Sequence, residues 1–132
     1  MKQHAIGLVA LIIILAIIAG IAAFFHPTVE SGMAVKQPIA DVTYVCDGGK
    51  TMHVLYYQGT TTPPASPGMP PTPGGSVTVT LSDGRTMTLP QTISADGARY
   101  ANADESFIFW SKGDGAFVME GNATTYANCV QQ

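Results

Sequence analysis

Residue patterns that support catalysis are scarce in this sequence. Only one of the three histidines, His53, lies beyond residue 40, and no Gly-x-Ser-x-Gly turn is present, which disfavours a Ser-His-Asp hydrolase. Clustered metal ligands are absent apart from the neighbouring Asp104 and Glu105, and no glycine-rich phosphate loop occurs. We therefore expect a protein that is not an enzyme and that binds neither a metal nor a cofactor.

Basic residues are also few. From Asp41 to the C-terminus, four lysines and arginines stand against eight aspartates and glutamates, a net charge of −4. Nucleic acids and anionic lipids demand a basic patch, so the sequence predicts no nucleic-acid partner. An acidic domain is instead attracted to a basic partner.

Charged residues are missing altogether from Ala5 to Phe25. As a helix, this run would span roughly 32 Å, close to the hydrocarbon thickness of a bilayer. Lys2 precedes the run and Glu30 follows it, so the positive-inside rule puts residues 26 onward outside the cytoplasm. We predict a transmembrane anchor in residues 1–25, with a cleaved signal peptide as the alternative. Because no cysteine ends the run, a lipid cannot be attached there.

Cysteine occurs at two positions only, Cys46 and Cys129. Two cysteines that frame an exported domain indicate a disulfide. The bridge would close a loop of about 84 residues and contribute about 4–5 kcal/mol to stability in the chain-entropy model. Two free buried thiols are the alternative.

Residues 26–40 resemble a short tether, and residues 41–132 carry β-strand patterns without an amphipathic helix. Asp47-Gly48-Gly49-Lys50 and Asp83-Gly84 are typical of hairpin turns. Pro90 is expected to end the strand that contains it. The predicted strands cover residues 42–46, 51–57, 76–81, 86–89, 99–101, 106–111, 116–120 and 123–129. The predicted inward-facing residues are Val77, Val79, Leu81, Met87 and Leu89. In strand 51–57 the alternation puts Met52, Val54 and Tyr56 on one face and His53, Leu55 and Tyr57 on the other.

Eight short antiparallel strands in about 90 residues favour a small closed barrel, which leaves no exposed edge. The two cysteines would then join the first and last strands, and a β-sandwich is the alternative fold. Residues 59–75 hold six prolines, too many for a strand or helix, so we predict an extended, mobile loop there.

Two polar segments flank the most aromatic strand. Loop 94–100 contains Asp96-Gly97 and ends at Tyr100, and turn 111–114 places Lys112 at a hairpin tip. A rigid scaffold that presents two short loops is suited to recognition, although both segments are also ordinary glycine-containing turns.

These segments resemble the MliC/PliC family of bacterial envelope inhibitors of c-type lysozyme. The resemblance covers about residues 42–130 in order and leaves only the Pro-rich loop as extra. It is carried by Tyr44-Val-Cys46-Asp-Gly-Gly-Lys50, Leu81-Ser-Asp-Gly84, Leu89-Pro-Gln-Thr-Ile-Ser-Ala-Asp-Gly-Ala-Arg-Tyr100, Phe109-Trp-Ser-Lys-Gly-Asp114 and Cys129.

The resemblance implies an eight-stranded antiparallel barrel that inhibits c-type lysozyme by occluding its cleft. Lys112, Gly113, Gly97 and Tyr100 match the family's Tyr-x-x-x-Thr-Lys-Gly and Ser-Gly-x-x-Tyr motifs directly. Ser111 stands where the family has threonine, and Phe107 stands where it has the first tyrosine. The predicted lysozyme-binding residues are Ser94, Asp96, Gly97, Tyr100, Ser111, Lys112 and Gly113.

Asp96 departs from the family, which has serine at that position. An ionised Asp96 would repel the enzyme's carboxylates unless it is protonated or pairs with Arg99 or Lys112. Ser94 keeps a hydroxyl nearby. The family's location places the domain in the periplasm, anchored in the inner membrane through residues 1–25.

Two other functions fit the same sequence. One is a module that binds envelope glycan or peptidoglycan, using Trp110 and Tyr100 as stacking faces. The other is a structural envelope domain whose inhibitor loop has decayed, as the presence of Asp96 would allow.

Overall fold

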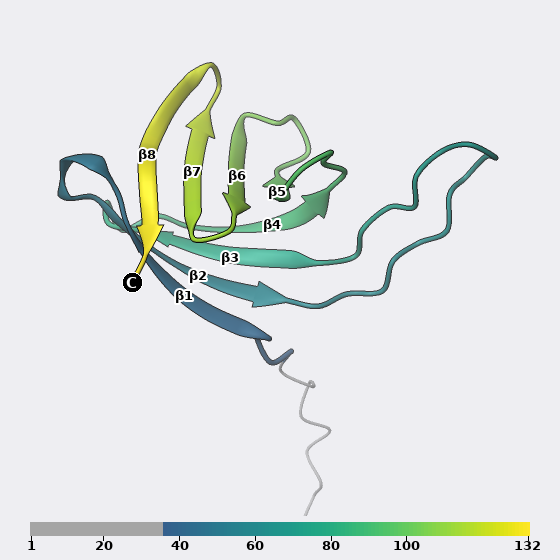
Figure 1. Cartoon of the computed structure of the whole chain (residues 1–132), viewed down its shortest axis with the longest axis horizontal. Coiled ribbons are helices and arrows are strands. Elements are labelled where there is room, and N and C mark those ends of the chain that lie inside the picture. Colours follow the sequence, from purple (N-terminus) through teal and green to yellow (C-terminus); the bar gives the residue numbers. More distant parts are fainter. Residues whose placement is uncertain (1–35) are drawn as a thin grey trace, which may run out of the picture. The chain divides into compact units, whose positions relative to one another are not determined.

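The computed structural model describes residues 36–132, which form a closed barrel of eight antiparallel strands (Figure 1). Each strand pairs with its neighbours in sequence, and the last pairs with the first. This confirms the predicted barrel over the sandwich. The strands are β1 (Ala40–Val45), β2 (Thr51–Tyr57), β3 (Ser76–Leu81), β4 (Thr86–Thr92), β5 (Ala98–Ala101), β6 (Phe107–Lys112), β7 (Gly115–Glu120) and β8 (Ala123–Gln131).

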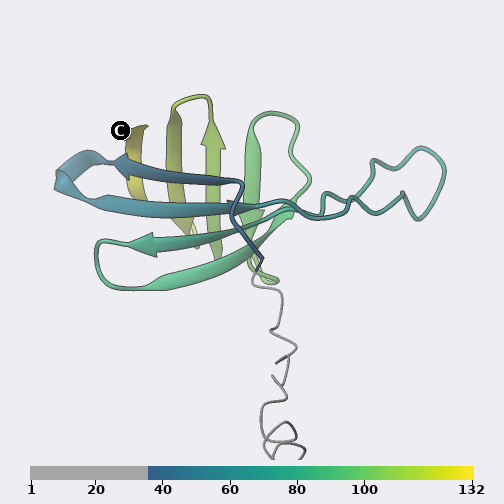
Figure 2. The ribbon, with the colours of Figure 1, turned by 90° about the horizontal axis from the view of Figure 1, so that it is seen from below.

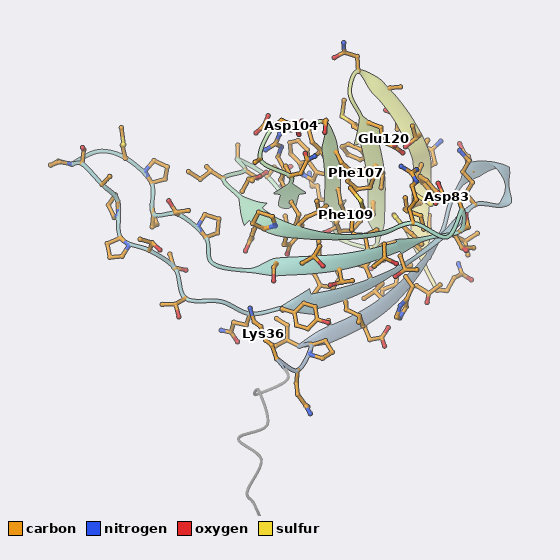
Figure 3. The ribbon with its side chains drawn as sticks, turned by 180° about the vertical axis from the view of Figure 1, so that it is seen from behind. Lys36, Asp83, Asp104, Phe107, Phe109 and Glu120 are labelled. Carbon is orange, nitrogen blue, oxygen red and sulfur yellow. A yellow bond between two sulfur atoms is a disulfide. The ribbon has the colours of Figure 1, made fainter. Side chains whose placement is uncertain are left out.

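The barrel interior follows from the alternation of side chains along each strand. In β3, Val77, Val79 and Leu81 are buried, as the sequence predicted, and the residues between them are partly exposed. Phe109 of β6 lies at the centre with no exposed surface and points into the barrel in Figure 3. Its ring lies about 6 Å from those of Tyr44, Tyr56 and Tyr100. One aromatic cluster therefore holds the two halves of the barrel together.

Closure of the barrel depends on a short contact. β1 and β8 pair only at Tyr44–Gln131 and Val45–Val130. The predicted disulfide is confirmed, because Cys46 at the end of β1 is bonded to Cys129 of β8. The disulfide thus reinforces one of the two ladders that have only two residue pairs, the other being that between β4 and β5.

β4 continues past Pro90 to Thr92, so the prediction that Pro90 ends this strand is wrong. On the β3 side, the Gln91 N–H donates to the Gly75 carbonyl at 2.8 Å, which leaves Pro90 at a position that makes no bond to β3. On the β5 side, pairing begins only at Gln91. The ladder therefore never requires the N–H that Pro90 lacks.

β8 is longer than predicted and contains bulges. Ala116 of β7 faces Cys129 and Val118 faces Tyr126, so three steps along β8 correspond to two along β7. Asn128 takes the extra position with φ at +49°, and its Nδ2 donates to Asp47 Oδ2 at 2.6 Å. This bond fixes the bulge against the β1–β2 connection.

The Pro-rich segment forms a long arm between β2 and β3 that projects away from the barrel (Figure 2). Its two sides are extended, as predicted, and are joined by one bridge in which Thr62 and Thr72 exchange N–H···O bonds of 2.9 and 3.0 Å. The mobility predicted for the arm stays a prediction.

The predicted anchor in residues 1–25, and all of the tether before residue 36, lie outside the described residues. Within residues 36–132, no helix has the length and apolar character needed to cross a membrane.

Candidate functional site

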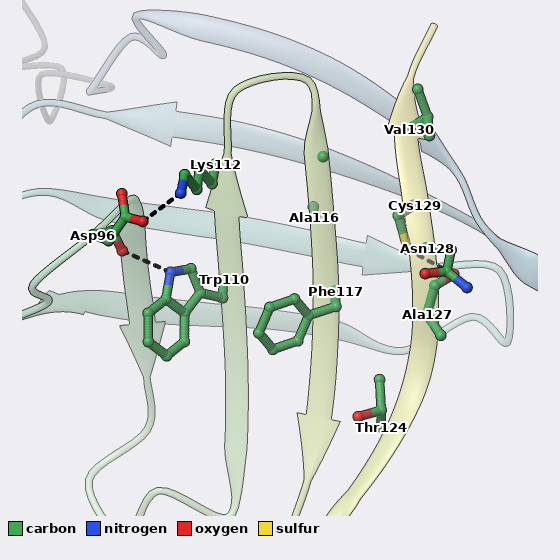
Figure 4. Close-up of a pocket in the computed structure, with 11 residues that line it drawn as sticks. Asp96, Trp110, Lys112, Ala116, Phe117, Thr124, Ala127, Asn128, Cys129 and Val130 are labelled. Atoms are coloured by element: carbon green, nitrogen blue, oxygen red, sulfur yellow. Dashed lines mark hydrogen bonds and ion pairs between the residues drawn. The ribbon is translucent and has the colours of Figure 1, made fainter.

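The two predicted recognition segments lie together at one end of β5, β6 and β7. Ala98 of β5 pairs with Ser111 of β6, and Lys112 pairs with Gly115 across a two-residue turn. This register brings the loop before β5 beside the turn after β6. We call residues 94–97 and 112–115 together the tip (Figure 4).

Asp96 and Lys112 form an ion pair that joins the two halves of the tip. Hydrogen bonding from the Lys112 ammonium lowers the pKa of the Asp96 carboxyl, and the positive charge of Lys112 and the Gly97 N–H add to this effect. Of the routes by which Asp96 could avoid repulsion, pairing with Lys112 is present in the unbound chain, and the lowered pKa favours the ionised carboxylate there. The side chains of Lys112 and Asp96 are 69% and 64% exposed, so the pair faces solvent.

Arg99, the other predicted partner of Asp96, binds elsewhere. Its guanidinium contacts Glu105 at 3.0 Å and the Thr92 hydroxyl at 2.9 Å. That ion pair lowers the pKa of Glu105. Arg99 thus ties the β5–β6 connection to β4 and contributes nothing to the tip.

Backbone contacts hold the loop half of the tip in place. The Ser94 hydroxyl donates to the Asp96 carbonyl at 2.6 Å, and the Trp110 indole N–H donates to the same oxygen at 2.9 Å. Gly97 has φ at +67°, and a Cβ there would lie 2.5 Å from the Ser111 carbonyl oxygen. Glycine is therefore required at this position both by backbone conformation and by space.

Tyr100 does not share the surface of the other predicted site residues. It is 6% exposed and packs its ring on Phe109 and Tyr56, and burial raises its pKa. Ser111 lies on the opposite face of β6 from Lys112, because neighbouring residues of a strand alternate. Of the predicted site residues, Asp96, Gly97, Lys112 and Gly113 are therefore exposed in the tip and Ser94 is half-buried, and the exposed Ala95 and Asp114 complete its surface.

A groove of about 760 Å³ runs from the tip across the outer face of the barrel. Trp110 and Phe117, paired across β6 and β7, form its aromatic part, with ring centroids 5.8 Å apart and planes at 28°. Asp96 and Lys112 line the end nearest the tip (Figure 4). The far side is lined by residues of β8, namely Thr124, Ala127, Asn128, Cys129 and Val130.

The groove was not predicted from the sequence, although a local pattern could have indicated it. The Gly113-Asp114 turn pairs Lys112 with Gly115, and this register necessarily pairs Trp110 with Phe117. Alternation then puts both rings on the face opposite Phe109. The contribution of β8 could not be found this way, because it depends on the bulge at Asn128.

Chemistry other than recognition finds little support at the site. Among the side chains of residues 36–132, no group of three or more His, Cys, Asp or Glu is arranged to hold a metal ion. His53 contacts Asp41 at 2.5 Å on the outside of β1 and β2, and no serine accompanies that pair.

Comparison with known proteins shows the family of the chain. Residues 44–126 match the MliC family, described as membrane-bound lysozyme-inhibitor of c-type lysozyme. The match begins in β1, ends in β8 and includes both halves of the tip.

Three relatives carry the name membrane-bound lysozyme inhibitor of C-type lysozyme. The protein from Cupriavidus necator is 32% identical over 93 residues, which are 67% of this chain and 62% of that protein. The Yersinia enterocolitica protein is 43% identical over 47 residues, 36% of this chain and 38% of its own length. The Escherichia coli protein is 44% identical over 50 residues, 38% of this chain and 44% of its own length. The chain thus spans less than two thirds of each relative.

No solved structure matches the chain. The family match extends over most of the barrel, and the similarity to the Cupriavidus protein covers two thirds of the chain. The chain therefore belongs to the MliC family of membrane-bound lysozyme inhibitors of c-type lysozyme.

Proposed function

We propose that this chain inhibits a c-type lysozyme by inserting the tip into the enzyme's substrate cleft. The observation that carries the proposal is the exposed Lys112 ammonium at the end of β6, beside a loop whose Asp96 carbonyl accepts from Trp110. A preorganised tip loses little conformational entropy on binding. The enzyme is known for its pair of catalytic carboxyl groups, and Lys112 is the group of the tip that would pair with them.

Asp96 need not be displaced for this to happen. A lysine ammonium has three N–H donors, and the described structure assigns one of them to the Asp96 carboxylate. The remaining donors are directed to the enzyme's carboxyl groups. The tip carries one lysine and two aspartates, Asp96 and Asp114, a net charge of −1. Its attraction to the enzyme's carboxyl groups therefore rests on direct contact with the Lys112 ammonium, and Asp96 weakens that attraction without abolishing it.

Ser94, Gly97 and Tyr100 would act mainly by shaping the loop. Ser94 bonds the loop backbone, Gly97 permits its turn, and Tyr100 anchors the strand that follows in the core. Ser111 would support Lys112 from beneath, and Gly113 would allow close approach of the enzyme to the turn.

The anchor and the location belong to the same proposal. Residues 1–25 would hold the barrel in the inner membrane, with residues 36–132 in the periplasm, where a lysozyme that crosses the outer envelope would be met. The names of the relatives include "membrane-bound", and the uncharged run from Ala5 to Phe25 has the length that such an anchor needs.

The alternative of glycan stacking between Trp110 and Tyr100 finds less support. Tyr100 is buried in the barrel, and Trp110 lies on its outside. One sugar cannot stack on both rings at once.

A binding assay separates these functions. The whole chain is applied to immobilised c-type lysozyme and to insoluble peptidoglycan, and the retained fraction is measured together with the rate of glycan hydrolysis. We expect retention on lysozyme and loss of hydrolysis. Retention on peptidoglycan alone would favour the glycan module, and retention on neither would favour a structural domain.

A further inference from the structure

If the tip binds a protein, the interface must extend beyond the tip, and the groove lies beside it. Specific protein complexes bury about 20–30 residues on each side, whereas the exposed tip offers only a few side chains. Most of the interface must therefore come from surfaces continuous with the tip. The groove is such a surface, because Asp96 and Lys112 are themselves part of its lining.

The lining of the groove suits a protein partner. Trp110 and Phe117 supply aromatic area, and tryptophan is enriched among residues that dominate binding energy. Val130, another residue of the lining, is 52% exposed, and its partner across the β1–β8 ladder, Val45, is 40% exposed. Contiguous exposed apolar surface with a polar rim marks sites of protein interaction.

The groove is also rigid enough to recognise a fixed shape. Its floor is the β6–β7–β8 ladder with buried Ala116 and Cys129, the latter held by the disulfide. The bulge at Asn128 bends β8 at the groove's far side and is fixed by its bond to Asp47. Gly115 lacks a side chain where the groove meets the turn.

We propose that this groove receives an apolar side chain from the rim of the lysozyme cleft while the tip occupies the cleft itself. The inference rests on the proposed function and adds a second contact area to it. The tip supplies charge recognition, and the groove supplies most of the apolar burial. Among the residues that line the groove, only Asp96 and Lys112 are charged, and they pair with each other. The occupant is therefore an uncharged, hydrophobic projection.

The test fills the groove without changing the tip. Ala127→Arg places a long charged side chain among the groove-lining residues, and Ala65→Arg makes the same change on the exposed Pro-rich arm as the matched control. Affinity of the whole chain for c-type lysozyme is measured by calorimetry, with Lys112→Ala alongside. We expect Ala127→Arg to weaken binding roughly tenfold or more, since an unpaired charge would be buried, and Ala65→Arg to leave it unchanged.

The outcomes are distinguishable. If Lys112→Ala weakens binding and Ala127→Arg does not, the groove inference is overturned and the proposed function stands. If the wild-type chain does not bind lysozyme, both are overturned. Should Ala127→Arg lower the unfolding midpoint, Thr124→Arg at the exposed rim of the groove replaces it with the same expected result.

Two other occupants are tested in the same samples. If sedimentation shows wild-type dimers that Ala127→Arg dissociates, the groove is an interface between copies of this chain, and the inference is overturned. Trp110 is the only tryptophan in the sequence, so its fluorescence reports directly on the groove. A fluorescence change with a chitooligosaccharide that Ala127→Arg abolishes would assign the groove to glycan and overturn the inference too.

Discussion

The tip and the Pro-rich arm are both connections between neighbouring strands, yet they are built differently. Within residues 94–97 and 112–115, an ion pair, two bonds to the Asp96 carbonyl and a close backbone contact at Gly97 fix the conformation. The arm has one bridge, between Thr62 and Thr72, in its exposed outer part. The arm also contains no charged residue.

The difference shows which connection between strands is held in a fixed conformation. Fixing a loop costs conformational entropy. In the tip, contacts with β6 offset this cost. A loop that is already fixed binds with a smaller entropic loss. We therefore propose the tip as the recognition element and the arm as an accessory, and the following predictions test that division.

Removing the disulfide should have the largest effect. Cys46→Ser with Cys129→Ser releases the short β1–β8 ladder beneath the groove. We expect a loss of about 4–5 kcal/mol in the free energy of unfolding, measured by denaturant titration. A loss below about 1 kcal/mol would mean that the ladder alone closes the barrel, and the groove would not depend on the bridge.

Lys112→Ala should remove the charge that the tip presents to the enzyme. We expect inhibition of c-type lysozyme to weaken by about 2–5 kcal/mol, the range for truncating one partner of a buried charge pair in a complex. Lys36→Ala removes an exposed lysine outside the tip and serves as the control. Equal inhibition by both variants would show that the tip is not the inhibitory surface.

Gly97→Ala and Gly68→Ala compare the two regions directly. Both glycines have positive φ, +67° and +88°, but only a Cβ at Gly97 meets other atoms, 2.5 Å from the Ser111 carbonyl oxygen. The left-handed conformation costs alanine about 1–2 kcal/mol at either site. We expect Gly97→Ala to be the more destabilising in denaturant titration and to weaken inhibition, whereas Gly68→Ala should not affect inhibition. A larger effect of Gly68→Ala would mean that the arm, and not the tip, is the region with the more tightly fixed conformation.

Asp96→Ser should strengthen inhibition by a few-fold. It restores the family's hydroxyl, frees Lys112 and removes a like charge facing the enzyme's carboxylates. Asp41→Ser, which removes the same charge from an exposed position of β1 outside the tip, is the control. Weaker inhibition by Asp96→Ser would mean that the ion pair with Lys112 is needed to hold the tip in shape.

The pH dependence of that gain follows from the pKa of Asp96. Because Lys112 lowers this pKa, Asp96 stays ionised at pH values where an ordinary aspartate, with a pKa near 3.9, is half protonated. The contribution of the pair to folding is therefore present above that ordinary value and is lost as pH falls through the lowered one. The difference in inhibition between wild type and Asp96→Ser should persist to about pH 4, measured against enzyme-only controls at each pH.

Shortening the arm should have the smallest effect. Replacing residues 61–73 with Asn-Gly keeps the Gly75 carbonyl that accepts from Gln91 and removes no core residue. Loop-closure entropy changes by about 0.6 kcal/mol for each halving of loop length, so stability should stay within about 1 kcal/mol of wild type. Loss of inhibition in this variant would show that the arm contacts the enzyme.

Local patterns in the sequence were sufficient for most of the barrel. The buried residues of β3 alternate, and Asp83-Gly84 closes its hairpin, so those strands and their inward faces could be predicted. The β8 bulge at Asn128 and the continuation of β4 through Pro90 could not. Both depend on which neighbouring strand needs a hydrogen bond at that point, and this is decided by tertiary pairing.

The same distinction applies to the site. The proposal of Lys112 and Gly97 as site residues came from the resemblance of their motifs to the family, and Lys112 was one of two partners foreseen for Asp96. The burial of Tyr100 was not foreseen, because its motif says nothing of the face on which the side chain lies. The groove required the register of β7 and β8 as well as the composition of β6.

Hydrogen exchange of the whole chain with and without c-type lysozyme tests the central claim most directly. We predict protection of amides in residues 94–97 and 112–115, together with β8 along the groove, and no change in the arm, residues 59–75. Lys112→Ala should remove this protection at the same concentrations. Protection confined to the arm, or an exchange pattern that lysozyme does not alter, would contradict the assignment of the tip as the inhibitory surface.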